Sequence, residues 1–123
     1  MYKKVLIATD GSVTASHAAE IGLDVAKASG AEAVLLHVGD PKDGKKVLAQ
    51  AEKTFTKSGV PVSTVSVSGD PADMSCEVAE RESVDLIVVG NKGMTGAKRF
   101  LLGSVPNQVS HHSPCNVLIV KTT

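Results

Sequence analysis

The residues between positions 90 and 104 are of the types that hold phosphate groups. Gly90 is followed after two residues by Gly93, and after nine more by Gly103 and Ser104. Glycines let the backbone approach a ligand closely, and successive amides in such a loop can bind an anion. A helix is expected to begin at Ser104, so free N–H groups, the positive end of the helix dipole and a hydroxyl would meet there. The spacing predicts a phosphate-binding loop; the alternative is a surface loop with ordinary turn glycines.

The charge distribution favours an anion at the same place. The chain has 13 basic and 13 acidic side chains and therefore no formal net charge. Residues 86–123 contain no Asp or Glu, but they contain Lys92, Lys98, Arg99 and Lys121. The first three lie on the glycine loop and could neutralise phosphate charge. The alternative is chance unevenness beside a solvated acidic helix near residues 73–82.

The elements that must position this loop alternate along the chain. Apolar runs predict strands at residues 5–8, 33–38, 60–67, 86–89 and 116–120. Helical spacing and capping residues predict helices at 13–29, about 45–58, 71–83 and 104–112, with residues 39–44 as a loop. Polar residues alternate through 60–67, which favours a strand near an edge, whereas 86–89 is uninterrupted and should be central.

Strands that alternate with helices form parallel βαβ units. We therefore expect an α/β fold in which residues 1–123 form a single domain, a doubly wound, Rossmann-like parallel sheet of five strands with four helices. In such sheets, ligands bind outside the carboxyl ends of the strands, where the strand order reverses. The residues expected at that edge are Thr9 to Ser12, Gly39, Gly69 with Asp70, and Gly90.

Composition excludes several other classes of protein. Zero net charge and only three aromatic residues argue against a nucleic-acid binder, because duplex binding needs a positive field and single-strand binding needs stacking platforms. No apolar run approaches the roughly 20 residues of a membrane-spanning helix. Two cysteines, with no disulfide framework, predict free thiols and a cytoplasmic protein.

With these motifs in this order, the chain resembles the universal stress protein family over essentially its whole length. The matching pieces are residues 5–12, 36–38, 69–72, 85–90, 101–105 and 114–120. One branch of that family binds ATP and carries the pattern G-x2-G-x9-G-[ST], which is intact here at Gly90, Gly93, Gly103 and Ser104.

The resemblance implies a small ATP-binding protein of the stress response, acting as a nucleotide-dependent switch with slow or no hydrolysis. Adenine would lie on the backbone of Val38, ribose near Asp10 and Gly90, and phosphates on the amides of Gly93, Gly103, Ser104 and Val105. Further implied contacts are Ala8, Thr9, Val89 and Lys92. Mg²⁺ would bridge phosphate oxygens with few protein ligands. The resemblance also implies a homodimer formed through the last strand, from Val117 to Val120.

The chain departs from the family pattern in three places. The loop after Val38 is short, Pro106 stands where relatives keep an amide donor, and Met74 with Ser75 replaces a position that is often aliphatic. The first departure concerns the cover over the nucleotide, and the second removes one donor near the phosphates.

Other functions remain open from the sequence. Asp10 could be catalytic or could cap the turn that follows it, and no second carboxylate is evidently paired with it. A phosphoryl-accepting receiver domain would use Asp10, Asp70 and Lys121, although Thr9 replaces the first member of its acidic pair.

Two weaker site hypotheses and one interaction hypothesis complete the alternatives. His111, His112 and Cys115 suggest a metal cluster, but a fourth ligand is not obvious. Cys76 and Cys115 could form a redox pair, although their surroundings are not evidently electropositive. The last alternative is a dimerising interaction module whose nucleotide site is vestigial.

Overall fold

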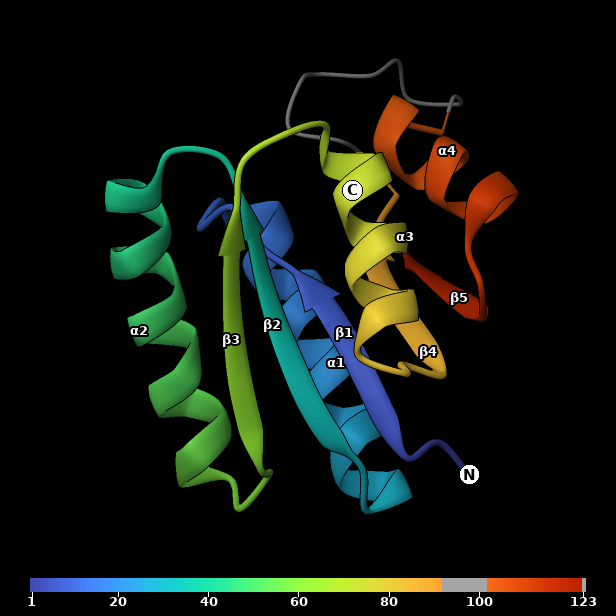
Figure 1. Cartoon of the computed structure of the whole chain (residues 1–123). Coiled ribbons are helices and arrows are strands. Elements are labelled where there is room, and N and C mark those ends of the chain that lie inside the picture. The colour runs from blue at the N-terminus through green and yellow to red at the C-terminus, as the bar shows by residue number, and fades with distance from the viewer. Residues whose placement is uncertain (92–101, 123) are drawn as a thin grey trace.

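A computed structural model describes residues 1–91 and 102–122 of the chain. In those residues the strands are β1 (Lys4–Ala8), β2 (Glu32–Val38), β3 (Val62–Val67), β4 (Leu86–Gly90) and β5 (Asn116–Val120). The helices are α1 (Val13–Ser29), α2 (Pro41–Lys57), α3 (Pro71–Arg81) and α4 (Ser104–His112). Every paired strand is parallel to its neighbour, and the order across the sheet is β3-β2-β1-β4-β5. The predicted doubly wound α/β fold is confirmed (Figure 1).

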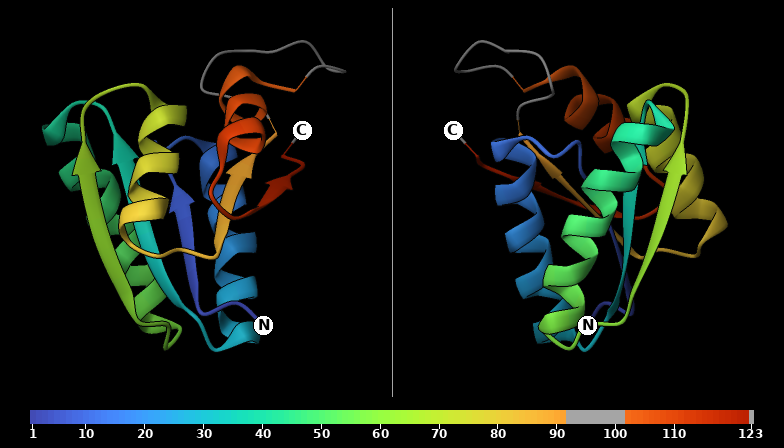
Figure 2. Two further views of the ribbon diagram at one scale, coloured as in Figure 1. Left: turned by 45° about the vertical axis from the view of Figure 1, so that its right-hand side comes forward. Right: turned by 90° about the vertical axis from the view of Figure 1, so that its left-hand side faces the viewer.

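The helices cover the two faces of the sheet in pairs (Figure 2). On one face, α1 and α2 pack against alternate strand residues such as Ile7 and Leu35. On the other face, α3 and α4 pack against the intervening residues, such as Leu6 and Leu36. The apolar runs of β1, β2 and β4 are strands buried on both sides, as expected for the interior of a parallel sheet.

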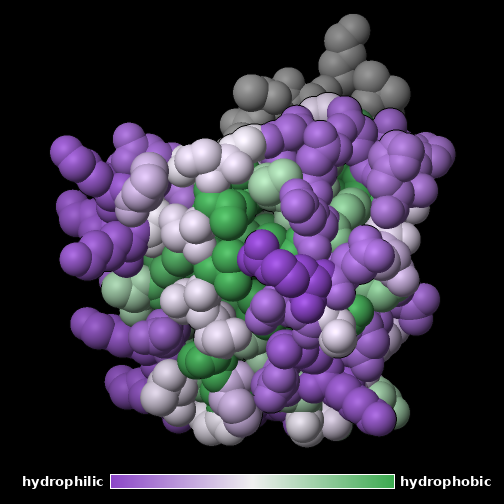
Figure 3. Space-filling view, in the orientation of Figure 1, coloured by the Kyte–Doolittle hydropathy of each residue, from purple (hydrophilic) through white to green (hydrophobic). Residues whose placement is uncertain are grey.

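Helices α3 and α4 cover their face of the sheet only in part. Val65 and Val67 of β3 and Val38 of β2 remain only partly buried, although they pack against the core on that face. Figure 3 shows apolar surface over the carboxyl-terminal part of β2 and β3, bordered by hydrophilic residues. The predicted position of β3 at an edge is confirmed, and the sheet is accessible beside α3.

Helix α1 has the predicted bounds because both of its ends are encoded locally. The Ser12 hydroxyl accepts a hydrogen bond from the N–H of Ala15 at 3.1 Å and caps the first turn. Gly30 ends the helix in the left-handed conformation, with φ of 66°, which glycine adopts without steric cost.

Helix α2 begins earlier than predicted. The expected loop at residues 39–44 is wrong, because the Asp40 carboxylate caps the N–H of Lys42 at 2.8 Å and Pro41 occupies the first helical position. Gly44 therefore lies inside the helix. A Cβ at Gly44 would lie 2.7 Å from His37 Nδ1, so the helix backbone packs directly on that imidazole. The connection from β2 to α2 is reduced to Gly39 and Asp40.

At the amino-terminal edge of the sheet, Asp85 joins β4 to β1. Its carboxylate accepts hydrogen bonds from the N–H groups of Lys3 at 2.9 Å and Lys4 at 3.0 Å. Burial opposes ionisation of this carboxylate, but these N–H donors outweigh it and lower the pKa of Asp85. The ionised carboxylate thus stabilises the pairing of the two central strands.

Candidate functional site

A crevice opens at the carboxyl ends of β1 and β4, where the strand order reverses. The connection after β1 leads to α1 on one face, and the segment after β4 leads to α4 on the other face. The crevice is partly open to solvent and contains about 650 Å³ of empty space when that open part is included. Its position is the one that the sheet topology predicts.

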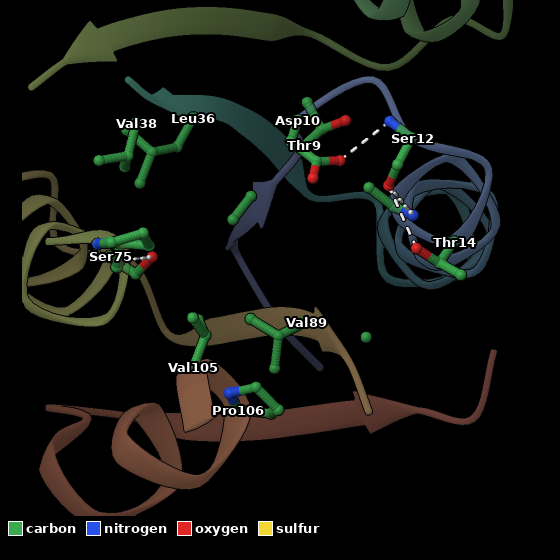
Figure 4. A pocket seen from close by; sticks show the side chains of 14 residues that line it. Thr9, Asp10, Ser12, Thr14, Leu36, Val38, Ser75, Val89, Val105 and Pro106 are labelled. Atoms are coloured by element: carbon green, nitrogen blue, oxygen red, sulfur yellow. Dashed lines mark hydrogen bonds between the residues drawn. The ribbon is translucent and has the colours of Figure 1, made fainter. Parts of the chain in front are cut away.

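Seven of the predicted site residues line this crevice together (Figure 4): Ala8, Thr9, Asp10, Val38, Val89, Gly90 and Val105. Gly103 and Ser104 lie beside it, at the start of α4, and are not part of the cavity wall. Lys92 and Gly93, like Lys98 and Arg99, lie outside the described residues. Residues from four separate segments of the sequence thus converge on one cavity.

The sequence interpretation missed the lining that comes from the first turns of helices. Thr14 and Ala15 come from the start of α1, next to Ser12, which was expected at this edge, and Pro71 and Ser75 come from the start of α3. Each of these helices begins close to the end of a strand, so its first turn borders the same edge of the sheet. Leu36 was also missed, although it precedes Val38 by two residues and therefore lies on the same face of β2.

The inner wall of the crevice is an apolar slot. Ala8, Leu36, Val38, Val89 and Val105 approach it from three strands and one helix. Leu36 is fully buried and Val89 nearly so, so they form the floor. Such a slot suits a flat, largely apolar ring system.

One polar edge of the slot comes from the backbone of Val38. Alternate residues of a parallel strand turn their N–H and carbonyl groups toward the same neighbour. The carbonyl of Leu36 accepts a hydrogen bond from the N–H of Thr9, on the β1 side, at 2.9 Å. The N–H of Gly39 donates to the carbonyl of Val67, on the β3 side, at 2.9 Å. Val38 therefore directs one donor and one acceptor toward the β1 side, beyond the last residue pair of the β1–β2 ladder.

The turn after β1 places a carboxylate at the opening of the slot. Asp10 Oδ1 accepts a hydrogen bond from the N–H of Ser12 at 2.9 Å, and the N–H of Gly11 donates to Thr9 Oγ1 at 3.3 Å. The expected capping role of Asp10 is therefore present. Asp10 is only half buried and also lines the crevice, so its second oxygen can accept a bond from a hydroxyl of a ligand.

The first turn of α4 supplies amide donors at the other end of the crevice. Gly103 caps the helix without a side chain, and its own N–H donates to the carbonyl of Asn91 at 2.9 Å. Pro106 carries no N–H. The donors of this turn that face an incoming anion are thus the N–H groups of Ser104 and Val105, at the positive end of the helix dipole.

Two other predicted clusters do not form a site in the structure. His111 and His112 are exposed in the last turn of α4, with ring centroids 6.3 Å apart. Within residues 1–91 and 102–122, no group of three or more His, Cys, Asp or Glu side chains is placed to hold a metal ion. Cys76 and Cys115 are free thiols, and burial raises the pKa of both, which favours the protonated form over the reactive thiolate.

The sheet order removes the receiver-domain alternative. A receiver of the flavodoxin-like order has its third strand directly beside the first, which brings its acidic residues together. Here β2 separates β3 from β1, and Asp70 follows the edge strand. The Asp70 carboxylate caps α3 by accepting the N–H of Asp73 at 3.0 Å.

The fold and the site together define a doubly wound α/β protein with a crevice at its topological switch point. The model of the universal stress protein family matches residues 1–56 and 42–121, and the chain belongs to that family. It is 33% identical to universal stress protein YxiE of Bacillus subtilis, with 98% of this chain and 100% of that protein aligned.

Two solved structures share the fold over nearly the whole chain. The protein MJ0577 superposes with a TM-score of 0.86 and 33% identity, covering 100% of this chain and 98% of the other. A universal stress protein crystallised in complex with cAMP superposes with a TM-score of 0.84 and 28% identity, covering 99% of each chain. In the described part of the chain, no helix is long and apolar enough to span a membrane.

Proposed function

We propose that the chain binds an adenine nucleotide in the crevice and acts as a nucleotide-dependent switch. The observation that carries the proposal is that three kinds of group meet at one crevice. They are an apolar slot beside the polar backbone edge of Val38, the Asp10 carboxylate, and the first amides of α4 at Ser104 and Val105. An adenine ring, a sugar and a phosphate need one group of each kind.

Each part of an adenine nucleotide has a partner in this arrangement. The donor and acceptor of Val38 match the adjacent ring nitrogen and exocyclic amine of adenine. The free oxygen of Asp10 accepts from a ribose hydroxyl, and Gly90 permits close approach of the sugar. The α4 amides bind a phosphate, and the glycine loop with Lys92 and Gly93 would complete the phosphate site. The cAMP complex of the related universal stress protein supports this class of ligand.

We further propose that ATP binds as its magnesium complex and is hydrolysed slowly or not at all. Among the described residues that line the crevice, Asp10 is the one carboxylate, and one of its oxygens is already bonded to Ser12. Mg²⁺ commonly keeps most of its water ligands and binds phosphate oxygens, so Mg·ATP needs few protein ligands. Hydrolysis requires a positioned water and groups that stabilise the transition state. The Asp10 carboxylate, with one oxygen already bonded to Ser12, does not supply both.

Calorimetric titration with AMP, ADP and Mg·ATP tests the proposal, with two Val→Asp variants as a matched pair. Val105 lines the crevice in the first turn of α4, whereas Val13 is 87% exposed in the first turn of α1 and is not part of the wall. Val105→Asp places a carboxylate against the phosphate and should abolish binding, whereas Val13→Asp should bind as the wild type does. Circular dichroism melting checks that both variants are folded. Absence of binding to the wild type, or equal binding by the two variants, would contradict the proposal.

We also propose a homodimer formed through β5. This strand pairs with β4 on one side, and no strand in the described part of the chain pairs with its other side. Val117, Leu118 and Ile119 stay half exposed, whereas their neighbours in β4 are buried. An apolar edge strand invites pairing with a second copy. Ile119→Lys should give a monomer in sedimentation analysis and Val13→Lys should not; a monomeric wild type would refute the dimer.

A further inference from the structure

Asn91, the residue directly after β4, connects three parts of the molecule through four hydrogen bonds. Its N–H donates to the carbonyl of Val120 at 2.8 Å, and its own carbonyl accepts from the N–H of Gly103 at 2.9 Å. Its side-chain Oδ1 accepts from both the N–H and the Oγ1 of Thr122, at 2.8 and 2.9 Å. The end of β4, the end of β5 and the start of α4 are therefore held by one residue.

The bond to Gly103 restrains the α4 amides. Gly103 has no side chain and makes no side-chain cap, so its backbone bond to Asn91 holds the start of the helix together with the packing of the buried Pro106. Ser104 and Val105 follow immediately, and their N–H directions depend on the position of Gly103. A displacement of Asn91 would thus move the amide donors at the phosphate end of the crevice.

The bonds to Thr122 hold Asn91 in turn. The β4–β5 ladder ends at the pair of Gly90 and Val120, and the amide oxygen of Asn91 continues it by two residues. A side-chain amide oxygen has two lone pairs, and Thr122 uses both. Neither Asn91 nor Thr122 lines the crevice, so both act on it only through the backbone.

We propose that Asn91 is a positioning residue for the phosphate end of the nucleotide site, and that Thr122, two residues beyond the end of β5, sets its position. The proposal rests on the nucleotide function proposed above. It makes phosphate affinity depend on a contact at the carboxyl end of the edge strand, away from the ligand. The adenine end of the site depends much less on this contact, because Val38, Leu36 and Ala8 belong to β2 and β1, and only Val89 and Val105 of the slot belong to elements that Asn91 joins.

The test compares AMP with adenosine, which lacks the phosphate, in calorimetric titrations of three variants. Thr122→Val removes the hydroxyl donor at nearly constant shape, and loss of one such bond should weaken AMP binding about threefold to tenfold. Thr122→Ser keeps the donor and should retain the wild-type affinity. Asn91→Ala should weaken AMP further, and adding Thr122→Val to it should change nothing more, because the two residues act in series. Adenosine affinity should stay within about twofold in all of them.

A second readout needs no ligand and remains available if Asn91→Ala does not fold. Amide hydrogen exchange of Gly103 should be faster in Thr122→Val than in the wild type and unchanged in Thr122→Ser. Equal weakening of AMP and adenosine, or unchanged Gly103 exchange in Thr122→Val, would overturn the proposal while leaving nucleotide binding intact. A wild type that binds neither compound would instead refute the nucleotide function and this positioning role with it.

Discussion

The effect of Gly44→Ala in α2 on the free energy of unfolding should depend on one neighbouring side chain, that of His37. Alanine favours a helix interior by about 1 kcal/mol over glycine, so Gly44→Ala would ordinarily stabilise α2. The added Cβ would, however, lie 2.7 Å from His37 Nδ1 and 3.2 Å from His37 Cγ, and His37 is buried, with only 5% of its surface exposed. Overpacking of this kind costs about 1–3 kcal/mol. We therefore expect Gly44→Ala to destabilise the wild type by about 1 kcal/mol.

Removal of the imidazole should reverse that sign. In a His37→Ala background the Cβ meets no ring, and Gly44→Ala should stabilise by up to about 1 kcal/mol, which gives a coupling free energy of about 2 kcal/mol. A Cβ at Gly44 would also lie 2.7 Å from Ser66 Oγ, but that side chain is exposed and can rotate away. In a Ser66→Ala background, Gly44→Ala should therefore remain destabilising, which makes Ser66→Ala the control.

Urea unfolding followed by circular dichroism measures each free energy of unfolding. A change of 1 kcal/mol moves the midpoint by roughly 0.3–1 M urea if the slope of the transition is constant. Stabilisation of the wild type by Gly44→Ala, or the same sign in the presence and absence of His37, would refute the reasoning. It would mean that α2 does not pack directly on the His37 ring.

Three further predictions follow from the described contacts. Asp85→Asn should lower the stability at neutral pH, because the depressed pKa of Asp85 gives a contribution that is present above its unfolded pKa, near 4. That contribution is lost as the pH falls through the folded pKa, so the difference between wild type and variant should close on acidification; a constant difference in urea titrations from pH 7 to pH 3 would contradict it. Burial raises the pKa of Cys76 and Cys115, so both should react with a thiol-specific disulfide reagent at pH 7.5 far more slowly than after unfolding in urea; equal rates would show that burial does not protect them. Ser12→Ala should cost about 1 kcal/mol through loss of the α1 cap, whereas Ser12→Asp should restore most of it, as measured by thermal melting.

Local signals predicted those elements whose ends are encoded by their own residues. Helix α1 has Ser12 and Gly30 at its ends, and both act as the sequence indicates. The predicted start of α2 was wrong because Gly39, Asp40 and Gly44 are of residue types that also form loops. The helical conformation of Gly44 depends on its packing against His37, which comes from β2, and no pattern near Gly44 reports that contact.

The site was predictable where it follows from strand ends and not where it follows from tertiary packing. Asp10 and Gly90 could be placed because parallel strands end at one edge of a sheet. The role of Ser75 in the wall depends on how α3 crosses the sheet, which the chain order does not determine. The hydrogen bonds of Asn91 join residues that are up to 31 positions apart, and they depend on which strands become neighbours.

Chemical-shift mapping of the backbone amides with AMP tests the central claim most directly, because it locates the ligand. We expect saturable shifts at residues around the crevice, with Ala8, Asp10, Val38, Ser104 and Val105 among them. The amino-terminal edge of the sheet, where Asp85 joins the central strands, should not respond. Shifts confined to another surface, or no saturable shifts at all, would contradict the account of this crevice as an adenine nucleotide site.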